Sequence, residues 1–363
     1  MPRRPDRAAG AEAEATFAQR VLRWQQQHGR HHLPWQGTRD PYRVWLSEVM
    51  LQQTQVSTVL AYYARFLERF PTVQALAEAP QDEVLALWSG LGYYSRARNL
   101  QKAAQAVMTL YGGRFPQTAD ALQALPGVGR STAAAIAAFC HGERAAILDG
   151  NVKRVLARAF AFDGDLARTP ELQRLWALAE SLLPERGIEA YTQGLMDLGA
   201  GVCLARQPRC EACPLVGDCK ARQAGQPEAY PVKRRKLRRG TRSNAWVWLT
   251  HRNQVWLVRR PDSGVWAGLW SLPEFDTVDE ALHALDALPG DPQPQPAVVH
   301  ALTHFDWTLL PLHWPLRRGQ GAVAALLAAR WPQGQWVDTA EALTRGIPTP
   351  LRRLLSAGPS SPP

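Results

Sequence analysis

The spacing of hydrophobic residues divides the chain into two parts. From about residue 13 to residue 222, apolar residues recur three and four positions apart, and Pro, Gly or Asp residues interrupt the pattern. That spacing places apolar side chains on one face of a helix, and the segments DEVLALWSGLGYY and TPELQRLWALAESLLPE are typical of it. No segment in this part alternates as a strand does. The first part is therefore predicted to be all-α.

The second part has the pattern of a mixed sheet with helices. Residues 245–250 and 254–259 are rich in Val, Trp and Leu and are separated by a short polar turn, which predicts a hairpin. Further strands are predicted at WSLPEF, AVVHALTH and WTLLPLHW, and helices near residues 278–288 and 350–355. This part is predicted to be an α+β domain.

Positive charge gathers between the two parts. The chain of 363 residues has a net charge of +10. Residues 221–260 contain 11 Lys or Arg and one Asp or Glu, a difference of +10, so the remainder is neutral overall. The densest stretch, PVKRRKLRRGTR, has no hydrophobic period and indicates a linker. Its charges either face solvent or contact nucleic-acid phosphates, and composition does not choose between these.

These patterns give a domain organisation. We predict a disordered tail at 1–16, a helical domain at 17–222, a basic linker at 223–242, an α+β domain at 243–356 and a tail at 357–363. No apolar run approaches the roughly 20 residues of a membrane span, and the N-terminal segment has no apolar core of a secretory signal. We expect an intracellular, cytoplasmic protein without a membrane partner, associated with the nucleoid if the source is bacterial.

Four cysteines lie close together near the end of the helical part. Cys203, Cys210, Cys213 and Cys219 have the spacing C-x6-C-x2-C-x5-C. With no secretory context to favour disulfides, this pattern indicates a metal site in the loop 203–219. Zinc and an iron-sulfur cluster both accept four thiolates, so spacing leaves the two open. The fifth cysteine, Cys140, is predicted to be a small buried residue.

A glycine-containing turn precedes a conspicuous aspartate. LPGVGR lies between two predicted helices, and Gly127 and Gly129 allow a tight turn with N–H groups near a helix N-terminus, where an anion can bind. This pattern predicts a helix-hairpin-helix at about 120–140, although a plain turn has the same glycines. Further along, ILDGNVKRV places Asp149 before Gly150 and Asn151, a position typical of a turn or helix N-cap.

A glutamate occupies an otherwise apolar helix. Within PYRVWLSEVMLQQTQV, Glu48 has apolar neighbours on nearly all sides of the predicted helix. Burial would raise its pKa and suit it to act as a general acid near neutral pH. A surface-facing glutamate beside Gln52 and Gln55 is the alternative interpretation.

The hairpin, the aspartate and the cysteines together resemble the endonuclease III superfamily of DNA glycosylases. The resemblance implies an all-α helix-hairpin-helix fold, a 4Fe-4S cluster on the four cysteines and a catalytic role for Asp149. Bifunctional members carry a nucleophilic lysine after the hairpin glycines, where this chain has Ser131. Serine cannot form an imine, so the resemblance implies a monofunctional enzyme in which water is the nucleophile.

The Glu48 segment and GLGYYSRARNL are similar to the adenine glycosylases of the MutY type. The resemblance implies that Glu48 protonates adenine N7, that Asp149 stabilises the oxocarbenium ion, and that Asn151 orients Asp149 or the water. Gln53 and Tyr93 would wedge the base stack while the adenine flips out. The remaining roles implied are a base pocket of Trp35, His31 and Gln193, and DNA contacts by Gly127, Gly129, Ser131, Lys153 and Arg154. Arg96 and Arg98 are expected to face phosphate or solvent.

The second domain resembles the MutT-like (Nudix) domain of such enzymes. The segment RRPDSGVWAGLWSLPEF carries the resemblance, but the acidic REUxEExGU helix needed for hydrolysis is missing from the sequence. This domain is therefore expected to recognise 8-oxoguanine through the loop Leu302-Thr303-His304, with Thr303 and His304 as contacts. The expected partner is double-stranded DNA with A opposite 8-oxoguanine or G, bound by a monomer.

Two alternatives stay open at this point. A bifunctional, endonuclease III-like glycosylase and lyase for pyrimidine lesions is opposed by Ser131 and by the second domain. A DNA-lesion-binding protein without catalysis would require Glu48 or Asp149 to be dispensable.

Overall fold

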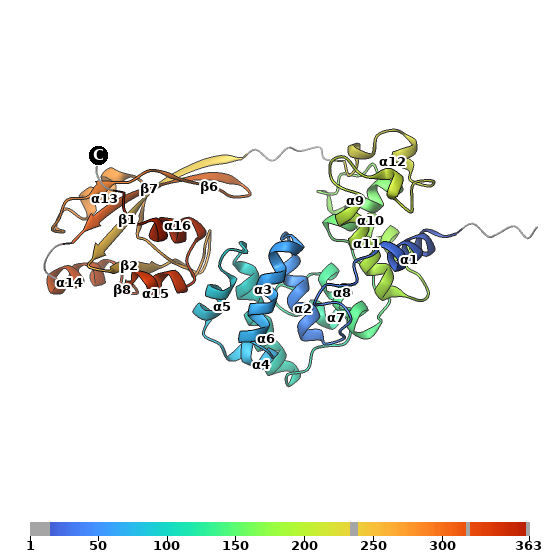
Figure 1. The fold of residues 1–363 in the computed structure, drawn as a ribbon, viewed down its shortest axis with the longest axis horizontal. Coiled ribbons are helices and arrows are strands. Elements are labelled where there is room, and N and C mark those ends of the chain that lie inside the picture. Colours follow the sequence, from blue (N-terminus) through green and yellow to red (C-terminus); the bar gives the residue numbers. More distant parts are fainter. Residues whose placement is uncertain (1–14, 233–238, 317–319, 361–363) are drawn as a thin grey trace, which may run out of the picture. The chain divides into compact units, whose positions relative to one another are not determined.

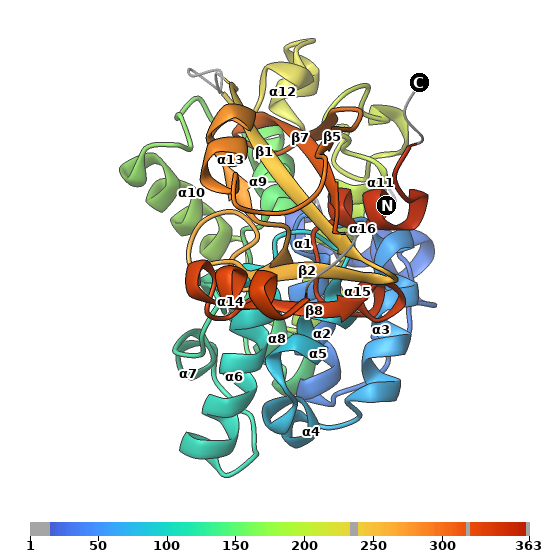
Figure 2. The ribbon, with the colours of Figure 1, turned by 90° about the vertical axis from the view of Figure 1, so that its left-hand side faces the viewer.

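The computed structural model describes residues 15–232, 239–316 and 320–360 (Figures 1 and 2). Parts of both predicted tails and of the basic linker, at 1–14, 233–238 and 361–363, lie outside this range.

Contacts group the chain into two compact units. The first unit comprises Met1–Glu48, Pro116–Ala124 and Val128–Arg235; the second comprises Val49–Phe115, Leu125–Gly127 and Lys236–Pro363.

The first unit is built from helices around one core. Helix α2 (Pro41–Leu51) starts in this unit and ends in the second. The other helices of the unit are α1 (Phe17–His28), α7 (Ala119–Gln123), α8 (Arg130–His141), α9 (Gly150–Ala159), α10 (Thr169–Ser181), α11 (Ile188–Gly201), α12 (Lys220–Gln223) and the 3₁₀ helices η1 (Cys210–Ala212) and η2 (Pro227–Ala229). Helix α11 packs against α1, α8 and α9, and their apolar faces supply buried residues such as Val21, Val152 and Leu198.

The helical part of the second unit consists of four helices. They are α3 (Val56–Arg69), α4 (Val73–Glu78), α5 (Gln81–Trp88) and α6 (Ser95–Tyr111). Helix α6 packs against α4 and α5 through the buried residues Leu100 and Val107. Throughout the described residues 15–232 every regular element is helical, which confirms the all-α prediction.

The rest of the second unit is an eight-stranded mixed sheet with helices. Its strands are β1 (Gly240–His251), β2 (Gln254–Arg259), β3 (Trp270–Ser271), β4 (Glu274–Phe275), β5 (Gln293–Pro294), β6 (Val298–Ala301), β7 (Phe305–Pro315) and β8 (Gln335–Asp338). The main path runs β3-β2-β1-β7-β5; β4, β6 and β8 pair with β1, β7 and β2, respectively. The predicted hairpin is confirmed, since β1 and β2 pair antiparallel with His251 opposite Gln254.

Four helices accompany the sheet. They are α13 (Val278–Ala284), α14 (Gln320–Arg330), α15 (Thr339–Thr344) and α16 (Thr349–Ala357). The predictions of α13 and α16 are confirmed, whereas β5, α14, α15 and β8 were not predicted. Strand β1 pairs in parallel with β7, from Gly240 opposite Phe305 to Thr250 opposite Pro315. The turn at Thr303 that joins β6 to β7 therefore lies close to Gly240, the first residue of β1.

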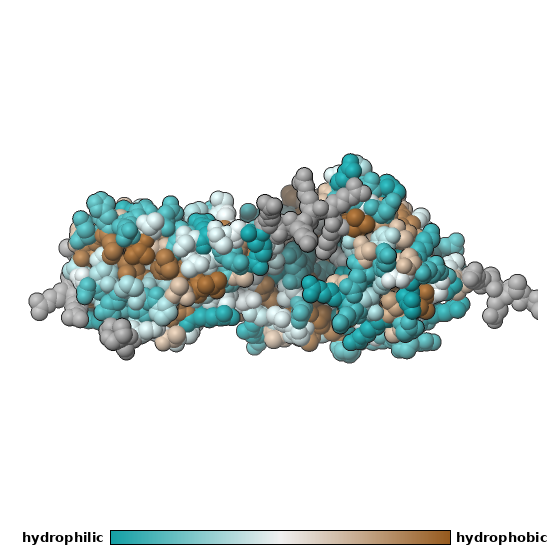
Figure 3. All heavy atoms as spheres, turned by 90° about the horizontal axis from the view of Figure 1, so that it is seen from above, coloured by the Kyte–Doolittle hydropathy of each residue, from teal (hydrophilic) through white to brown (hydrophobic). Residues whose placement is uncertain are grey.

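Exposed large hydrophobic residues mark a few places on the surface. The face shown in Figure 3 is largely hydrophilic, with hydrophobic side chains in small groups. Tyr93 is 45 % exposed, whereas its neighbour Tyr94 is buried. Among the described helices, none is both long and apolar enough to cross a membrane.

Candidate active site

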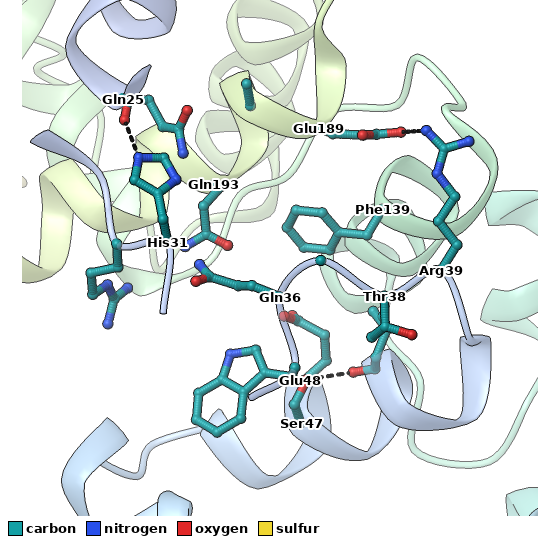
Figure 4. A pocket seen from close by; sticks show the side chains of 15 residues that line it. Gln25, His31, Gln36, Thr38, Arg39, Ser47, Glu48, Phe139, Glu189 and Gln193 are labelled. Carbon is teal, nitrogen blue, oxygen red and sulfur yellow. Dashed lines mark hydrogen bonds and ion pairs between the residues drawn. The ribbon is translucent and has the colours of Figure 1, made fainter. Parts of the chain in front are cut away.

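A pocket of about 390 Å³ opens in the first unit beside Glu48 (Figure 4). Glu48 reaches it from α2, Gln193 from α11 and Phe139 from α8. The loop between α1 and α2 supplies a further part of the wall. The residues that line it include the three expected in a base pocket, Trp35, His31 and Gln193.

Glu48 has the environment of a proton donor. It lies between the buried residues Trp45, Leu46, Val49 and Met50 of α2, and its own side chain is partly accessible at the pocket wall. Loss of bulk water around the carboxyl, with the charge of Asp149 as a smaller cause, raises the pKa of Glu48 to about 8. The carboxyl therefore holds its proton at neutral pH.

Asp149 is the N-cap of α9. Its Oδ1 accepts a hydrogen bond of 2.7 Å from the backbone N–H of Val152, as the sequence pattern predicted. The segment leading to it is held by Ser131, whose Oγ accepts the N–H of Leu148 at 3.0 Å. Ser131 thus holds the backbone just before Asp149. This contact comes in addition to the absence of an amine that could form an imine at this position.

The two carboxylates share one environment rather than opposite ones. The division of roles between the two carboxylates needs different pKa values, which opposite environments would supply. Burial also raises the pKa of Asp149, but the N–H groups of Val152 and Asn151, followed by the charges of Arg154 and Lys153, oppose that rise. No comparable donor opposes it among the causes acting on Glu48. The difference in pKa between the two carboxyl groups therefore comes from the helix N-terminus at Asp149.

Asn151 and Arg154 connect the Asp149 turn to the cysteine loop. Arg154 Nη2 donates to Asn151 Oδ1 at 2.9 Å and to Gly199 O at 2.6 Å, and its Nε donates to Cys203 O at 2.7 Å. These acceptors engage Nε and Nη2, whereas Nη1 lies 3.4 Å from Gly150 O at the exposed side, so a DNA contact of Arg154 stays a prediction. Lys153, next to it, is half-buried and has no such contact among those the structure records for described residues.

An aspartate that the sequence did not single out fixes the Gln193 side chain. Asp197, which is 4 % exposed, accepts hydrogen bonds from Arg30 N at 2.9 Å, Arg30 Nε at 2.6 Å and Gln193 Nε2 at 2.8 Å. A carboxylate only accepts hydrogen bonds, so Gln193 must turn its NH₂ group to Asp197. The amide oxygen of Gln193 is thereby left for the pocket. His31, which lines the same pocket, has its Nε2 3.0 Å from Gln25 O.

The predicted hairpin forms between α7 and α8. Gly127 has a φ of 76°, and a Cβ there would approach Asn99 Cβ to 2.6 Å, so the turn requires glycine. Gly129 is the N-cap of α8, and both glycines are exposed. The first N–H groups of α8 are thus open to an anion.

The four cysteines surround one small cavity. Cys203, Cys210, Cys213 and Cys219 all line it, together with Arg158, whose Nη1 lies 3.4 Å from Cys203 Sγ. Burial, with the neighbouring thiols adding to it, raises the pKa of Cys213 to about 12. Thiols that crowd in this way fit a cation bound as thiolates. In the described part of the chain, no three His, Cys, Asp or Glu side chains are arranged as ligands of a single metal ion.

The expected wedge residues are exposed and share an unusual backbone conformation. Gln53 and Tyr93 have φ values of 58° and 47°, in the left-handed region that non-glycine residues rarely adopt. The phenol oxygen of Tyr93 lies 3.0 Å from Thr303 Oγ1, in the exposed turn between β6 and β7. His304 is exposed in the same turn, and its carbonyl accepts the N–H of Gly240.

Two arginines near Tyr93 do not face phosphate or solvent as we expected. Arg96 is buried and donates to backbone carbonyls, and Arg98 Nη1 donates to Ala267 O at 2.6 Å. The prediction was wrong because carbonyl acceptors brought together by the fold leave no pattern in the sequence.

Two family models match the chain. Residues 46–180 match the HhH-GPD superfamily of base excision DNA repair proteins, and residues 244–357 match the NUDIX domain. The adenine DNA glycosylase of Buchnera aphidicola from Acyrthosiphon pisum is 40 % identical over 73 % of this chain and 76 % of its own. That of Buchnera aphidicola from Schizaphis graminum is 33 % identical and covers 93 % of this chain and 97 % of its own. The human adenine DNA glycosylase is 34 % identical and covers 94 % of this chain and 74 % of its own.

Solved structures resemble the helical part. A thermostable thymine-DNA glycosylase superposes with a TM-score of 0.52 at 32 % identity, and covers 57 % of this chain and 95 % of its own. A non-covalent endonuclease III–DNA complex superposes with a TM-score of 0.50 at 23 % identity, and covers 57 % of this chain and 94 % of its own. Together these likenesses confirm the predicted fold class, a helical glycosylase domain followed by a Nudix-like domain.

Proposed function

This chain belongs to the adenine DNA glycosylases, and from that premise we propose how its pocket removes the base. Members of the family are enzymes of base excision repair that act on DNA and release adenine, and this chain is one of them. The proposal concerns the residues that do the chemistry, the pairing of the adenine, and the cofactor. The observation that carries it is the burial of the Glu48 carboxyl at the pocket wall, which together with the charge of Asp149 raises its pKa.

Glu48 is the proton donor to adenine N7. Adenine leaves poorly as an anion, so the glycosidic bond breaks readily only when the base receives a proton. With a pKa of about 8, the carboxyl of Glu48 is protonated at neutral pH and still acidic enough to give up its proton in the transition state. It lies in the pocket into which the flipped base would enter.

Asp149 stabilises the positive charge that develops on the sugar. As the bond breaks, the sugar becomes an oxocarbenium ion, which a nearby carboxylate stabilises electrostatically or through a transient adduct. The N–H groups of Val152 and Asn151 favour the ionised form of Asp149. Asn151, held by Arg154, orients this turn. Water then completes the hydrolysis.

The amide of Gln193 supports adenine as the base in the pocket. Adenine carries its 6-amino donor beside N7 on one edge, and this edge fits an amide oxygen from Gln193 together with a carboxyl proton from Glu48. Guanine carries an oxygen at position 6, which the same amide oxygen would repel. Asp197 keeps the amide in this orientation, and Trp35 and His31 complete the pocket wall.

We propose that the second domain recognises the base paired with the target adenine. The exposed pair Thr303 and His304 would contact 8-oxoguanine, or guanine, opposite the adenine, while Gln53 and Tyr93 fill the stack. The DNA contacts proposed at the hairpin and the first turns of α9 are those of Gly127, Gly129, Ser131, Lys153 and Arg154. We keep the domain limits 17–222 and 243–356 as predictions, with recognition rather than hydrolysis in the second domain. We likewise propose that the chain acts as a monomer.

A base-release assay tests this function. Duplexes with A opposite 8-oxoguanine, A opposite G, or thymine glycol are incubated with the protein, and free base and strand breaks are measured with and without alkali. We expect adenine from the first two, and strand breaks only after alkali because Ser131 cannot form an imine. Breaks without alkali at thymine glycol, with no adenine released, would favour the pyrimidine-lesion glycosylase and lyase instead.

We also propose that Cys203, Cys210, Cys213 and Cys219 hold a 4Fe-4S cluster. The cavity that all four cysteines line supports four thiolate ligands around one group. When bound, such a cluster ties four points of the 203–219 loop together and is capable of electron transfer. The chain's own contribution is Arg158, which holds the loop through Cys203 Sγ and Ala205 O.

Colour tests this cofactor. The purified protein should be yellow-brown with broad absorbance near ~400 nm, and Cys213→Ser should lose absorbance together with thermal stability, because the loop loses a ligand. Iron and sulfide analysis and a melting curve provide the measurements. A colourless wild-type protein with stoichiometric zinc would contradict the cluster.

A further inference from the structure

Arg96 is a buried arginine whose two terminal guanidinium nitrogens both donate to protein acceptors. The residue is 8 % exposed. Its Nη1 donates to the carbonyls of Val49, Met50 and Gln52 at 3.0, 2.8 and 2.6 Å. Its Nη2 donates to Thr54 Oγ1, Leu91 O and Gly92 O at 3.1, 3.1 and 3.2 Å. Its Nε makes no hydrogen bond but is buried, so the guanidinium offers no accessible donor to a DNA phosphate.

The acceptors belong to two separate turns. One is the end of α2 with the residues that follow, up to Thr54, and the other is the turn between α5 and α6. Gln53 lies within the first turn and Tyr93 directly after Gly92 in the second. Each of these two residues has a left-handed φ, and each is exposed. One buried side chain thus holds both turns that present the expected wedge residues.

The cation also acts on the aromatic rings around it. Arg96 Cζ lies 5.6 Å from the ring centre of Tyr93 and 5.2 Å from that of Trp88. A left-handed backbone at a non-glycine residue persists only where the surroundings enforce it. Six hydrogen bonds from one planar group are such an enforcement, and an ammonium, with three donors, cannot reproduce them.

We propose that Arg96 is the positioning residue of the wedge: it holds the two turns in the conformation in which Gln53 and Tyr93 are ready to enter the base stack. This inference rests on the proposed function, because it assigns those two side chains to the gap left by the flipped adenine. Turns formed before DNA binds need no ordering during binding, so Arg96 lowers the cost of base flipping without touching DNA.

The test compares Arg96→Lys in two backgrounds. One is the wild-type chain, and the other carries Gln53→Ala and Tyr93→Ala. In the wild-type background we expect about a tenfold or larger loss of the single-turnover rate on A opposite 8-oxoguanine, and in the wedge-free background less than about a twofold further loss. An equal loss in both backgrounds would overturn the inference, since it would assign Arg96 a general structural role.

A binding readout separates positioning from chemistry. In a Glu48→Gln background, 2-aminopurine beside the target adenine should brighten on binding, and Arg96→Lys should reduce that increase. Arg114→Lys, an exposed arginine in the same unit, is the matched control and should leave rate and brightness unchanged. Undiminished brightness in Arg96→Lys would contradict the proposal.

A milder variant covers the case in which Arg96→Lys does not fold. Thr54→Val removes one acceptor and leaves the guanidinium in place, so it should give a smaller loss that also vanishes in the wedge-free background. A loss of equal size there would overturn the inference. If the wild-type protein released no adenine, the proposed function would fail; adenine release with additive losses would reject the role of Arg96 alone.

Discussion

Glu48→Gln lowers the single-turnover rate of adenine release from a duplex with A opposite 8-oxoguanine by about 100- to 10,000-fold, the range that general acids contribute. Glutamine has nearly the same shape but no acidic proton, so adenine must leave without protonation at N7. The loss should fall on the rate and leave the dissociation constant for the duplex within about threefold, because the carboxyl works in the transition state. Rapid quench with excess enzyme and a binding titration measure the two.

The control for this variant is a glutamate outside the pocket. Glu185 is exposed in the same unit, and Glu185→Gln should retain the wild-type rate. If Glu48→Gln kept more than about a third of the wild-type rate, Glu48 would not be the proton donor, and the raised pKa would only reflect its burial.

Asp149→Asn lowers the same rate by about 100- to 1000-fold, the loss typical of removing one electrostatic contact with a developing charge. Asparagine is as good an N-cap as aspartate, so α9 should keep its start and the melting temperature should change little. Asp149→Ala, by contrast, loses the cap as well, at a cost of about 1 kcal/mol in stability. Paired melting curves and single-turnover rates separate charge from capping.

Asp149 also affects the pKa of Glu48. The charge of Asp149 contributes to the raised pKa of Glu48, so removing it should lower that pKa and move the fall in activity to lower pH. Asp163→Asn, at an exposed position, is the control and should change neither rate nor pH dependence. A near-normal rate in Asp149→Asn would mean that the oxocarbenium ion is stabilised elsewhere.

Local patterns predicted most helices and strands, the N-cap position of Asp149 and the apolar surroundings of Glu48. Each of these features leaves a signal in neighbouring residues of the sequence. Asp149 precedes Gly150 and Asn151 as an N-cap does, and Glu48 interrupts an apolar helix. The hairpin strands alternate around a short turn. Helix α14 was missed because its stretch of Ala and Leu, outside the segments with a clear period, resembles any short apolar run.

Long-range contacts account for the residues that were not predicted. Arg96 donates to carbonyls more than forty positions earlier, and Asp197 pairs with Arg30 across 167 positions. Backbone acceptors carry no side-chain signature, and one aspartate in a helix is most often a surface residue. Only the folded chain shows that Asp197 orients Gln193 and that Ser131 holds the segment before Asp149.

The pH dependence of adenine release tests the central claim most directly. The single-turnover rate on A opposite 8-oxoguanine is measured from about pH 6 to pH 9.5 for the wild type, with Glu48→Gln in parallel. Since the protonated carboxyl is the active form, the wild-type rate should be level at low pH and fall about tenfold for each pH unit above about 8, while Glu48→Gln stays slow and flat. A wild-type rate that remains level through pH 8 and above, or one that falls in the same way in Glu48→Gln, would contradict proton donation by Glu48.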